Sequence, residues 1–420
     1  MPQTIVVNFA YLDPKFNGGT SHIGFHIAHA LLEQAGIRPI FAVNAAFAPQ
    51  FEQWLGKPAV ILPINAAPSL IAIQLKQIER TLAPQFIVSP LFGIDPFELK
   101  DGVNHIAGMP DTLVLDHPEY FSRDTVLNRS AIYEKLRRAS KVVTISQFSA
   151  AKLKQHLQLT DAQLVIAPLG AELNAKTADT SIVLEGRYWL YPANLWPHKR
   201  HDLLLRAFAA AREHDPSLQL ILSGNNALFQ EKFGELIQSL GLPETSVRHL
   251  GYVSESQLAA LYQGAEAMVF TSAYEGFGMP LLEAMQAGCP VICAPTTAIP
   301  EVAGNAAIYV DSDDPTAWAQ AALELNERRE ALTAAGRAHV NLFSWDYTRE
   351  QWLKALVEAG MRSGTGTPAI RAVSQGKLCE SAEIALEYST SNKGRKLQLL
   401  PRWWRLQRQM LANAAAFARA

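Results

Sequence analysis

The sequence has few cysteines, almost no net charge and no long apolar run, and each shortage excludes a class of protein. Its three cysteines, Cys289, Cys293 and Cys379, cannot provide a disulfide framework for 420 residues, so we expect a reducing compartment. A formal net charge of -2 at pH 7 argues against an overall electrostatic grip on nucleic acid. No run reaches the roughly 18 apolar residues of a membrane-spanning helix, and the N-terminus does not read as a signal peptide. We therefore expect a cytoplasmic protein.

Apolar residues are abundant, at 49% of the sequence, and they form short β-branched runs that alternate with helical patterns. Such alternation is typical of βαβ units and a parallel sheet. The rhythm breaks at a mostly polar segment from 174 to 185 and then starts again. We therefore predict an α/β protein with two doubly wound Rossmann-like domains, residues 1–180 and 181–362, that face a cleft.

The C-terminal end differs in composition from the rest of the chain. Residues 363–392 begin with a stretch rich in small and turn-forming residues, which predicts a linker. Residues 393–420 contain seven Lys or Arg and no acid. Here Trp403, Leu406, Met410, Ala414 and Phe417 fall on one helical stripe. A basic amphipathic helix suits peripheral contact with an anionic membrane, but packing against the body of the protein or a partner is slightly favoured.

Two glutamates bracket a glycine-containing loop in the stretch EGFGMPLLE. A strand is predicted before Glu275 and a helix that starts at Pro280 after it, so the loop lies where open parallel sheets bind ligands. Gly276 and Gly278 allow the backbone close to a ligand, and the helix start offers free N–H groups to phosphate. Carboxylates accept from hydroxyls, so a nucleotide sugar fits. The alternative is that Glu283, in the first helical turn, only complements the helix dipole.

The stretch NLWPHKR at 194–200 places basic residues between a predicted strand and a helix. Positive charge opposes the dipole at a helix start, so an anionic ligand explains the cluster better than a solvated surface does. Lys199 is the candidate phosphate partner, acting as a point charge.

A glycine pair, Gly18 and Gly19, follows the first predicted strand and opens a helix, which is a weak signal of a phosphate loop. His22 and His26 lie four residues apart on that helix. A metal pair is conceivable, but no third ligand is evident nearby. Polar residues lining a cleft are the favoured interpretation, and no metal site is predicted.

Several of these stretches resemble retaining glycosyltransferases of family 4, which have the GT-B fold. The similarity is dense from about 188 to 348 and thinner in the first half. The matching stretches occur in the family's order: YPANLWPHKRHDLLLRAF, LILSG, the run from HLGYVSES through EGFGMPLLE to IPEVAG, and FSWDYT.

The resemblance implies roles at the donor site. Glu283 would hold the ribose hydroxyls of the nucleotide, and Glu275 would contact hydroxyls of the transferred sugar. Lys199 stands where the family keeps a lysine against the donor diphosphate. The remaining implied donor-site residues are the backbone N–H groups of Phe277, Gly278 and Met279, the loop glycines Gly18 and Gly19, and Gly224 at the end of a strand that faces the nucleotide.

The chain departs from the family pattern at two places. Asn194 stands where many members have an arginine, so it can hydrogen-bond phosphate without supplying charge. In the stretch MPDTLVLDHPEYF, Asp111 matches the family's aspartate but Pro110 replaces its histidine. His105 or His117 would have to substitute for that histidine on the acceptor side. Asp111 could also be a plain loop residue or a helix cap.

By resemblance, the activity is transfer of a sugar with retained anomeric configuration, without metal or cofactor. The donor would be a GDP- or UDP-linked sugar, with mannose the leading candidate. The acceptor would be a glycan or a lipid-linked molecule in polysaccharide or glycoconjugate synthesis. Two alternatives stay open: a non-catalytic GT-B protein that binds nucleotide sugars or acts as a scaffold, and a nucleotide-sugar epimerase.

Overall fold

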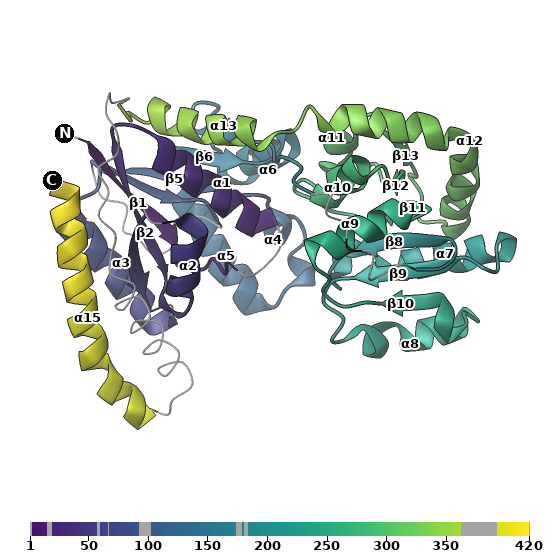
Figure 1. The fold of residues 1–420 in the computed structure, drawn as a ribbon, viewed down its shortest axis with the longest axis horizontal. Coiled ribbons are helices and arrows are strands. Elements are labelled where there is room, and N and C mark those ends of the chain that lie inside the picture. Colours follow the sequence, from purple (N-terminus) through teal and green to yellow (C-terminus); the bar gives the residue numbers. More distant parts are fainter. Residues whose placement is uncertain are drawn as a thin grey trace.

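The computed structural model describes residues 2–14, 19–56, 59–65, 67–91, 102–173, 179, 184–362 and 393–419. Two parallel sheets organise these residues into two units that lie side by side (Figure 1). The predicted fold class, with two doubly wound α/β units, is confirmed. The predicted linker, residues 363–392, lies outside the described residues, and the boundary between 180 and 181 stays a prediction.

The first unit is a seven-stranded sheet in the order β3-β2-β1-β4-β5-β6-β7. Its strands are β1 (Gln3–Phe9), β2 (Ile37–Asn44), β3 (Val60–Ile64), β4 (Phe86–Ser89), β5 (Asn104–Gly108), β6 (Lys141–Thr144) and β7 (Leu164–Ile166). Its helices are α1 (Gly19–Glu33), α2 (Ala48–Leu55), α3 (Pro68–Leu82), α4 (Leu113–Asp116), α5 (Arg123–Leu136) and α6 (Gln147–Leu157). The strands are buried almost throughout, as expected when helices cover both faces of a parallel sheet. The sequence analysis missed β7, because three apolar residues carry too little periodicity to identify a strand.

The second unit is a six-stranded sheet in the order β10-β9-β8-β11-β12-β13. Its strands are β8 (Tyr188–Pro192), β9 (Gln219–Ser223), β10 (Val247–His249), β11 (Ala267–Phe270), β12 (Val291–Cys293) and β13 (Ala307–Tyr309). Its helices are α7 (His201–His214), α8 (Phe229–Ser239), α9 (Glu255–Gly264), α10 (Met279–Ala287), α11 (Ile299–Ala303) and α12 (Pro315–Val340). Strand order reverses between β8 and β11. Ligands of open α/β sheets bind beyond the carboxyl ends of the strands at such a reversal, so this point locates the candidate site.

Two later helices return to the first unit. Helix α13 (Trp345–Glu358) packs against α1, β6 and β7, although the sequence analysis assigned these residues to the second domain. Helix α15 (Lys393–Arg419) lies along the outer side of the first unit, against α3 and β3 (Figure 1). The predicted amphipathic helix therefore exists, and in this structure it packs on the protein body.

The apolar stripe of α15 faces α3 and β3. Trp403, Leu406 and Met410 are buried. Trp403 Nε1 and Gln407 Nε2 donate to Gln74 Oε1 over 3.0 and 2.9 Å, so the indole has the partner that a buried Trp requires. None of the helices in the described part of the chain combines the length and apolar character needed to cross a bilayer.

Candidate active site

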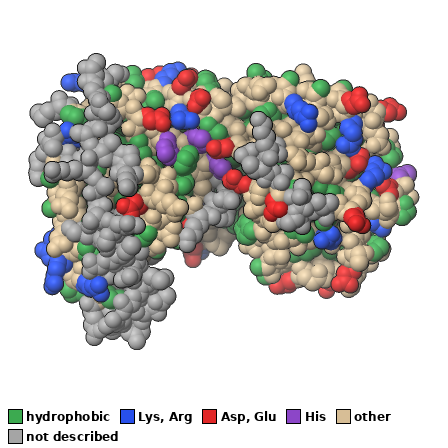
Figure 2. Space-filling model, in the orientation of Figure 1, with side chains coloured by type: hydrophobic (Ala, Val, Ile, Leu, Met, Phe, Trp, Pro, Cys, Tyr) green, Lys and Arg blue, Asp and Glu red, His purple; other side chains and the backbone are tan. Residues whose placement is uncertain are grey.

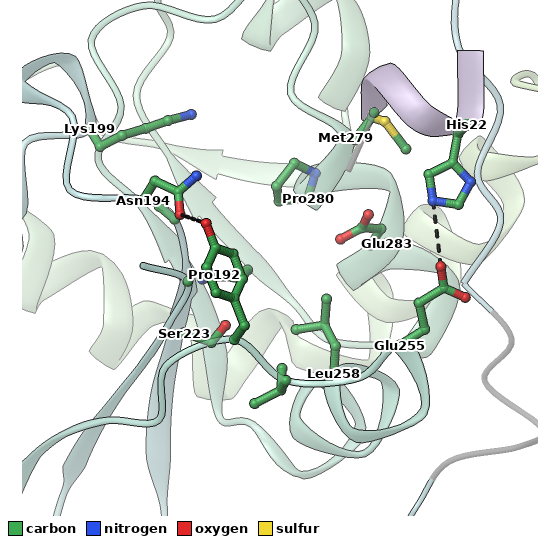
Figure 3. A pocket seen from close by; sticks show the side chains of 15 residues that line it. His22, Pro192, Asn194, Lys199, Ser223, Glu255, Leu258, Met279, Pro280 and Glu283 are labelled. Atoms are coloured by element: carbon green, nitrogen blue, oxygen red, sulfur yellow. Dashed lines mark hydrogen bonds and ion pairs between the residues drawn. The ribbon is translucent and has the colours of Figure 1, made fainter. Parts of the chain in front are cut away.

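A cavity of about 360 Å³ opens at the carboxyl ends of β8 and β9 (Figure 3). We call it the switch-point cavity. Its lining comes from the loops after β8, β9 and β10, from the starts of α9 and α10, and from the start of α1 in the first unit: Gly19, His22, Pro192, Ala193, Asn194, Lys199, Ser223, Gly224, Tyr252, Val253, Glu255, Leu258, Met279, Pro280 and Glu283. Both units therefore contribute to one cavity.

Lys199 and Glu275 form an ion pair next to this cavity. Lys199 Nζ lies 2.5 Å from Glu275 Oε1, and the two side chains are only 15% and 11% exposed. A short 3-10 helix, η5 (Pro197–Lys199), carries Lys199, and its carbonyl accepts from Tyr191 Oη and Thr271 Oγ1 over 2.8 and 3.1 Å. Glu275 is held by its own N–H, which donates to Thr297 Oγ1 over 2.9 Å. The two strands at the point of reversal, β8 and β11, thus each deliver one charge.

Glu283 projects into the switch-point cavity from the side opposite Lys199 (Figure 3). Because α10 begins at Met279, Glu283 starts the second helical turn, and the predicted placement in the first turn is wrong. Burial raises its pKa, a hydrogen bond from Tyr262 opposes that rise, and the nearby His22 lowers the pKa further. Tyr262 Oη donates to Glu283 Oε2 over 3.0 Å. Burial disfavours the charged form of this carboxylate, and it lies beyond the first turn of α10, so complementing the helix dipole is a poor explanation for it. Its oxygens can instead accept hydrogen bonds from ligand hydroxyls.

The loop between the two glutamates has little spare space. Gly278 adopts a φ of +100°, in the left-handed region that favours glycine. A Cβ on Gly276 would lie 2.9 Å from the Cβ of Asp111, so the loop touches the first unit there. The Phe277 side chain is buried and packs edge-on against Phe343, which leaves its backbone as the part that can meet a ligand. Met279 contacts Gly19 at the edge of the cavity, since a Cβ on Gly19 would lie 2.8 Å from Met279 Sδ.

The opposite wall of the cavity carries Asn194 and Gly224. Asn194 Oδ1 accepts from Asn225 N and Tyr252 Oη over 2.8 and 3.3 Å, as Figure 3 shows for the tyrosine. Its amide nitrogen has no partner in the described part of the chain, so it can donate to a phosphate. Gly224 has a φ of +124°, and a Cβ there would lie 2.9 Å from Ala193 O. Gly18 lies outside the described residues.

Asp111 follows the carboxyl end of β5 and lies against the loop between Glu275 and Glu283, which we call the glutamate loop. Its Oδ1 accepts from Leu113 N over 3.0 Å, a local turn contact at the start of α4. Burial raises its pKa, as does Glu275, while the Leu113 N–H and Lys199 lower it. These electrostatic contacts place Asp111 beside the Lys199–Glu275 pair. Asp111 thus belongs to the same constellation without a direct hydrogen bond to either partner.

The two histidines considered as substitutes lie at different places. His105 is buried near the amino end of β5, the end away from the cavity, so it cannot replace the missing histidine. His117 stacks on Tyr120 and meets Tyr274 edge-on, with ring centroids 5.6 Å apart in the second case. His117 is therefore the one histidine of these two that lies near the glutamate loop.

Hydrogen bonds between the units fix this loop, and the sequence analysis missed most of them. Tyr274 Oη donates to Asp116 Oδ2 over 2.8 Å, from the residue before Glu275. Ser146 donates through Oγ to Gly276 O over 2.7 Å. Glu301 accepts from the N–H groups of Gln147 and Phe148 at the start of α6, where a carboxylate also complements the helix dipole.

His22 agrees with the favoured interpretation of polar residues that line a cleft, whereas Glu172 and Glu255 were not expected beside it. His22 lines the cavity, with Nε2 at 3.5 Å from Glu255 Oε1. Glu172, which no motif singled out, accepts from both histidines and so supplies the third neighbour that was not evident in the sequence. A signal for Glu255 was available: Ser254 and Gln257 form a capping box, and its S-x-x-Q spacing marks Glu255 as the first residue of a helix.

Comparisons with known proteins agree with this geometry. The family model "Glycosyl transferases group 1" matches residues 174–339. O-antigen chain mannosyltransferase B of Escherichia coli is 31% identical over 259 residues, covering 58% of this chain and 68% of that protein. D-inositol 3-phosphate glycosyltransferase of Geodermatophilus obscurus is 28% identical over 246 residues, covering 53% of each. The chain thus spans about two thirds of the first relative and about half of the second.

Solved structures confirm the fold. Anabaena HepE in complex with UDP and glucose has a TM-score of 0.66 at 19% identity, covering 84% of this chain and 99% of that one. WaaG, a glycosyltransferase involved in lipopolysaccharide biosynthesis, has a TM-score of 0.62 at 15% identity, covering 85% of this chain and all of WaaG (100%). These similarities establish the GT-B arrangement. Together with the family match and the relationship to the Escherichia coli protein, they show that this chain belongs to the group 1 glycosyltransferases.

Proposed function

We propose that this glycosyltransferase moves a sugar, with mannose the leading candidate, from a GDP- or UDP-linked donor to a glycan or lipid-linked acceptor in polysaccharide or glycoconjugate synthesis. The anomeric configuration is retained, and neither a metal ion nor a cofactor takes part in the transfer. Mannose is supported by the relationship to the Escherichia coli O-antigen mannosyltransferase. A nucleotide-sugar donor is supported by HepE, which was solved with UDP-glucose.

The observation that carries the proposal is the distribution of charge around the switch-point cavity. Lys199 stands on one side and Glu283 on the other, with the N-terminus of α10 between them (Figure 3). A donor whose ribose meets Glu283 would place its diphosphate toward the helix start and Lys199. A fixed cation there offsets the charge that the leaving diphosphate gains in the transition state.

The Lys199–Glu275 pair has a further consequence for donor binding. In the structure each charge neutralises the other at 2.5 Å. A bound diphosphate would compete for Lys199 and release Glu275 to accept from hydroxyls of the transferred sugar. The leaving phosphate would then help to deprotonate the acceptor on the same face, which is the route that retains the anomeric configuration without a protein nucleophile.

The acceptor would enter between the units, where Asp111 and His117 face the glutamate loop. Peripheral membrane contact through 393–420 also stays a proposal. The exposed Arg405 and Arg408 of α15 supply positive charge for it, whereas the apolar stripe is already packed.

A thermal-shift screen with GDP, UDP and their sugars tests donor binding, because a ligand that binds the native state stabilises it. We expect one nucleoside diphosphate to raise the melting temperature and its sugar to raise it further. The preferred donor is then incubated with lipid-linked and oligosaccharide acceptors. The anomeric configuration of the product is read by NMR, and the assay is repeated with a chelator.

The two alternatives predict other outcomes. Binding without turnover on any acceptor would favour a scaffold. Conversion of one nucleotide sugar to its epimer, without an acceptor, would favour an epimerase. An inverted product, or loss of transfer on chelation when the donor is saturating, would overturn the proposed mechanism, although not the family assignment.

A further inference from the structure

A second cluster of polar side chains lies beside the switch-point cavity, where α1 meets the segment after β7. His22 Nδ1 lies 3.1 Å and His26 Nε2 lies 2.7 Å from the same atom, Glu172 Oε2. The three ligand atoms all fall within 4.8 Å of one another. Figure 2 shows histidine and acidic side chains gathered on this face near the junction of the two units. We propose that His22, His26 and Glu172 form a binding site for one divalent transition-metal ion of the Zn²⁺ class.

The spacing of the donor atoms is close to what such an ion requires. Zn²⁺ binds imidazole nitrogen and carboxylate oxygen at about 2.0–2.2 Å, so ligand atoms of a tetrahedral site stand roughly 3.3–3.5 Å apart. The two histidine–carboxylate distances are 3.1 and 2.7 Å, and the pair of ring nitrogens lies within 4.8 Å. Shifts of about an ångström or less in side chains, without movement of α1, would therefore bring all three atoms to bonding positions.

The surroundings also fit a metal site. A metal-bound histidine usually donates its other ring N–H to a carboxylate, which fixes the ring and its tautomer. If Nδ1 of His22 binds the ion, Nε2 is left to donate to Glu255 Oε1, now 3.5 Å away. The ring of His26 stacks on Trp345, with centroids 4.2 Å apart and planes 11° apart, so its orientation is already restrained. The side chain of Glu172 is 43% exposed, which gives an ion a path from solvent.

The donor set indicates the class of ion. Two imidazoles and one carboxylate form the three-ligand pattern of open zinc sites, with a fourth position for water. The same nitrogen-rich set disfavours Mg²⁺ and Ca²⁺, which prefer oxygen ligands. His22 and Lys199 stand on opposite sides of the cavity (Figure 3), so the ion would take no part in sugar transfer.

Because the cluster lies where the two units meet, a bound ion would strengthen the contact between them. Its ligands belong to α1 and to the segment that follows the last strand of the first unit, while Glu255 belongs to α9 of the second unit. An ion that fixes the His22 ring therefore strengthens a contact across the two units at the rim of the cavity. We expect metal binding to favour the arrangement seen here and to change nucleotide affinity.

Co²⁺ titration of the full chain tests the site without any nucleotide. The protein is prepared without a polyhistidine tag and treated with chelator. We expect one Co²⁺ per chain, with the intense visible absorption of a four-coordinate ion, and loss of that signal when Zn²⁺ is added. Because no donor or acceptor is present, failure here leaves the proposed glycosyltransferase function untouched.

Variants then assign the signal to the three residues. His26→Phe keeps a ring against Trp345, and Glu172→Gln keeps a hydrogen-bond acceptor, but each removes one ligand and should weaken Co²⁺ binding by at least about tenfold. His29→Phe, one turn further along α1, is the matched control and should bind as the wild type does. Unchanged absorption in both His26→Phe and Glu172→Gln, or several weak sites per chain, would overturn the proposal. Should His26→Phe fail to fold, Glu172→Gln decides, since that side chain is partly exposed.

Discussion

Lys199 and Glu275 illustrate how two residues 76 positions apart are brought to one point. Each follows a strand that flanks the reversal of strand order, so the sheet topology rather than local sequence pairs them. A mostly buried ion pair offers little net stability, because desolvation offsets the attraction. We interpret the pair as an interaction that a bound diphosphate breaks, because the diphosphate competes with Glu275 for Lys199.

This interpretation predicts that Glu275→Gln separates nucleotide binding from transfer. The variant removes the competitor for Lys199, so the nucleoside diphosphate should bind at least as tightly as it does to the wild type. Transfer should fall by about 100-fold or more, since an interaction with the reacting sugar is lost. Titration calorimetry with the diphosphate measures the affinity, and initial-rate assays measure the transfer. Transfer at the wild-type rate would contradict the role of Glu275.

Glu283→Gln should have the opposite effect on the nucleotide. Loss of a hydrogen bond to a charged group costs about 1.5–3 kcal/mol, which raises the dissociation constant of the diphosphate roughly 10- to 100-fold. Burial raises the pKa of Glu283, so the ionised side chain destabilises the apo protein at neutral pH. The free energy of unfolding of the apo variant should therefore equal or exceed that of the wild type.

The control for this variant is Glu324→Gln, on the exposed side of α12. It should change neither the dissociation constant of the diphosphate nor the free energy of unfolding. Reduced apo stability together with weaker binding would indicate damage to the fold and would contradict the assigned role of Glu283.

At the scale of elements, α4, α6 and the loop after β11 are connected through Asp116. Its carboxylate is buried, which opposes ionisation. Hydrogen bonds from Thr112, His156, Lys152 and Tyr274 nevertheless lower its pKa to about 2. Tyr274 precedes Glu275, so this connection also positions Glu275.

Asp116→Asn should reduce the free energy of unfolding by about 2–3 kcal/mol at pH 7. The folded-state pKa of about 2 lies below the ordinary value of 3.8, and each unit is worth about 1.4 kcal/mol. A lowered carboxyl pKa stabilises the fold above pH 3.8, and this contribution is lost as the pH falls from 3.8 to 2. The wild type and the variant should therefore converge in acid.

Urea unfolding at several pH values between 7 and 2 measures this difference, with the exposed Asp311→Asn as control. A difference that stays constant over that pH range would exclude the ionised Asp116 as its cause.

At the scale of the whole molecule, the chain forms the second unit and then returns to pack on the first. Helices α13 and α15 both pack on the first unit, after the second has been completed. The second crossing of the chain between the units therefore limits how far they can move apart. Interactions between the units also include the buried Ser146 Oγ to Gly276 O hydrogen bond.

Trp403→Ala should show that α15 is an integral part of the first unit. The side chain is fully buried and donates to Gln74, so its truncation should cost about 3–5 kcal/mol of unfolding free energy. Arg405→Ala, on the exposed face, is the control and should cost less than about 0.5 kcal/mol. Urea unfolding followed by tryptophan fluorescence and circular dichroism measures both. An unchanged midpoint for Trp403→Ala would mean that α15 does not pack as described.

The sequence by itself determined the local features of this protein. Its β-branched runs and helical patterns predicted most elements, and the glycines Gly276 and Gly278 marked the loop between Glu275 and Glu283. Resemblance then connected these residues to nucleotide-sugar chemistry. Such features are readable because they depend on periodicity and on backbone conformation within a few residues.

Only the tertiary structure decided which distant residues meet. It paired Lys199 with Glu275, placed Glu283 in the second turn of its helix, and excluded His105 because that residue lies near the amino end of β5, away from the cavity. It also brought Glu172 to His22 and placed the stripe of α15 against α3 and β3. These contacts follow from strand order and from the return of the chain to the first unit. No local pattern encodes either one, because an apolar stripe or a single carboxylate has the same sequence signature whatever covers it.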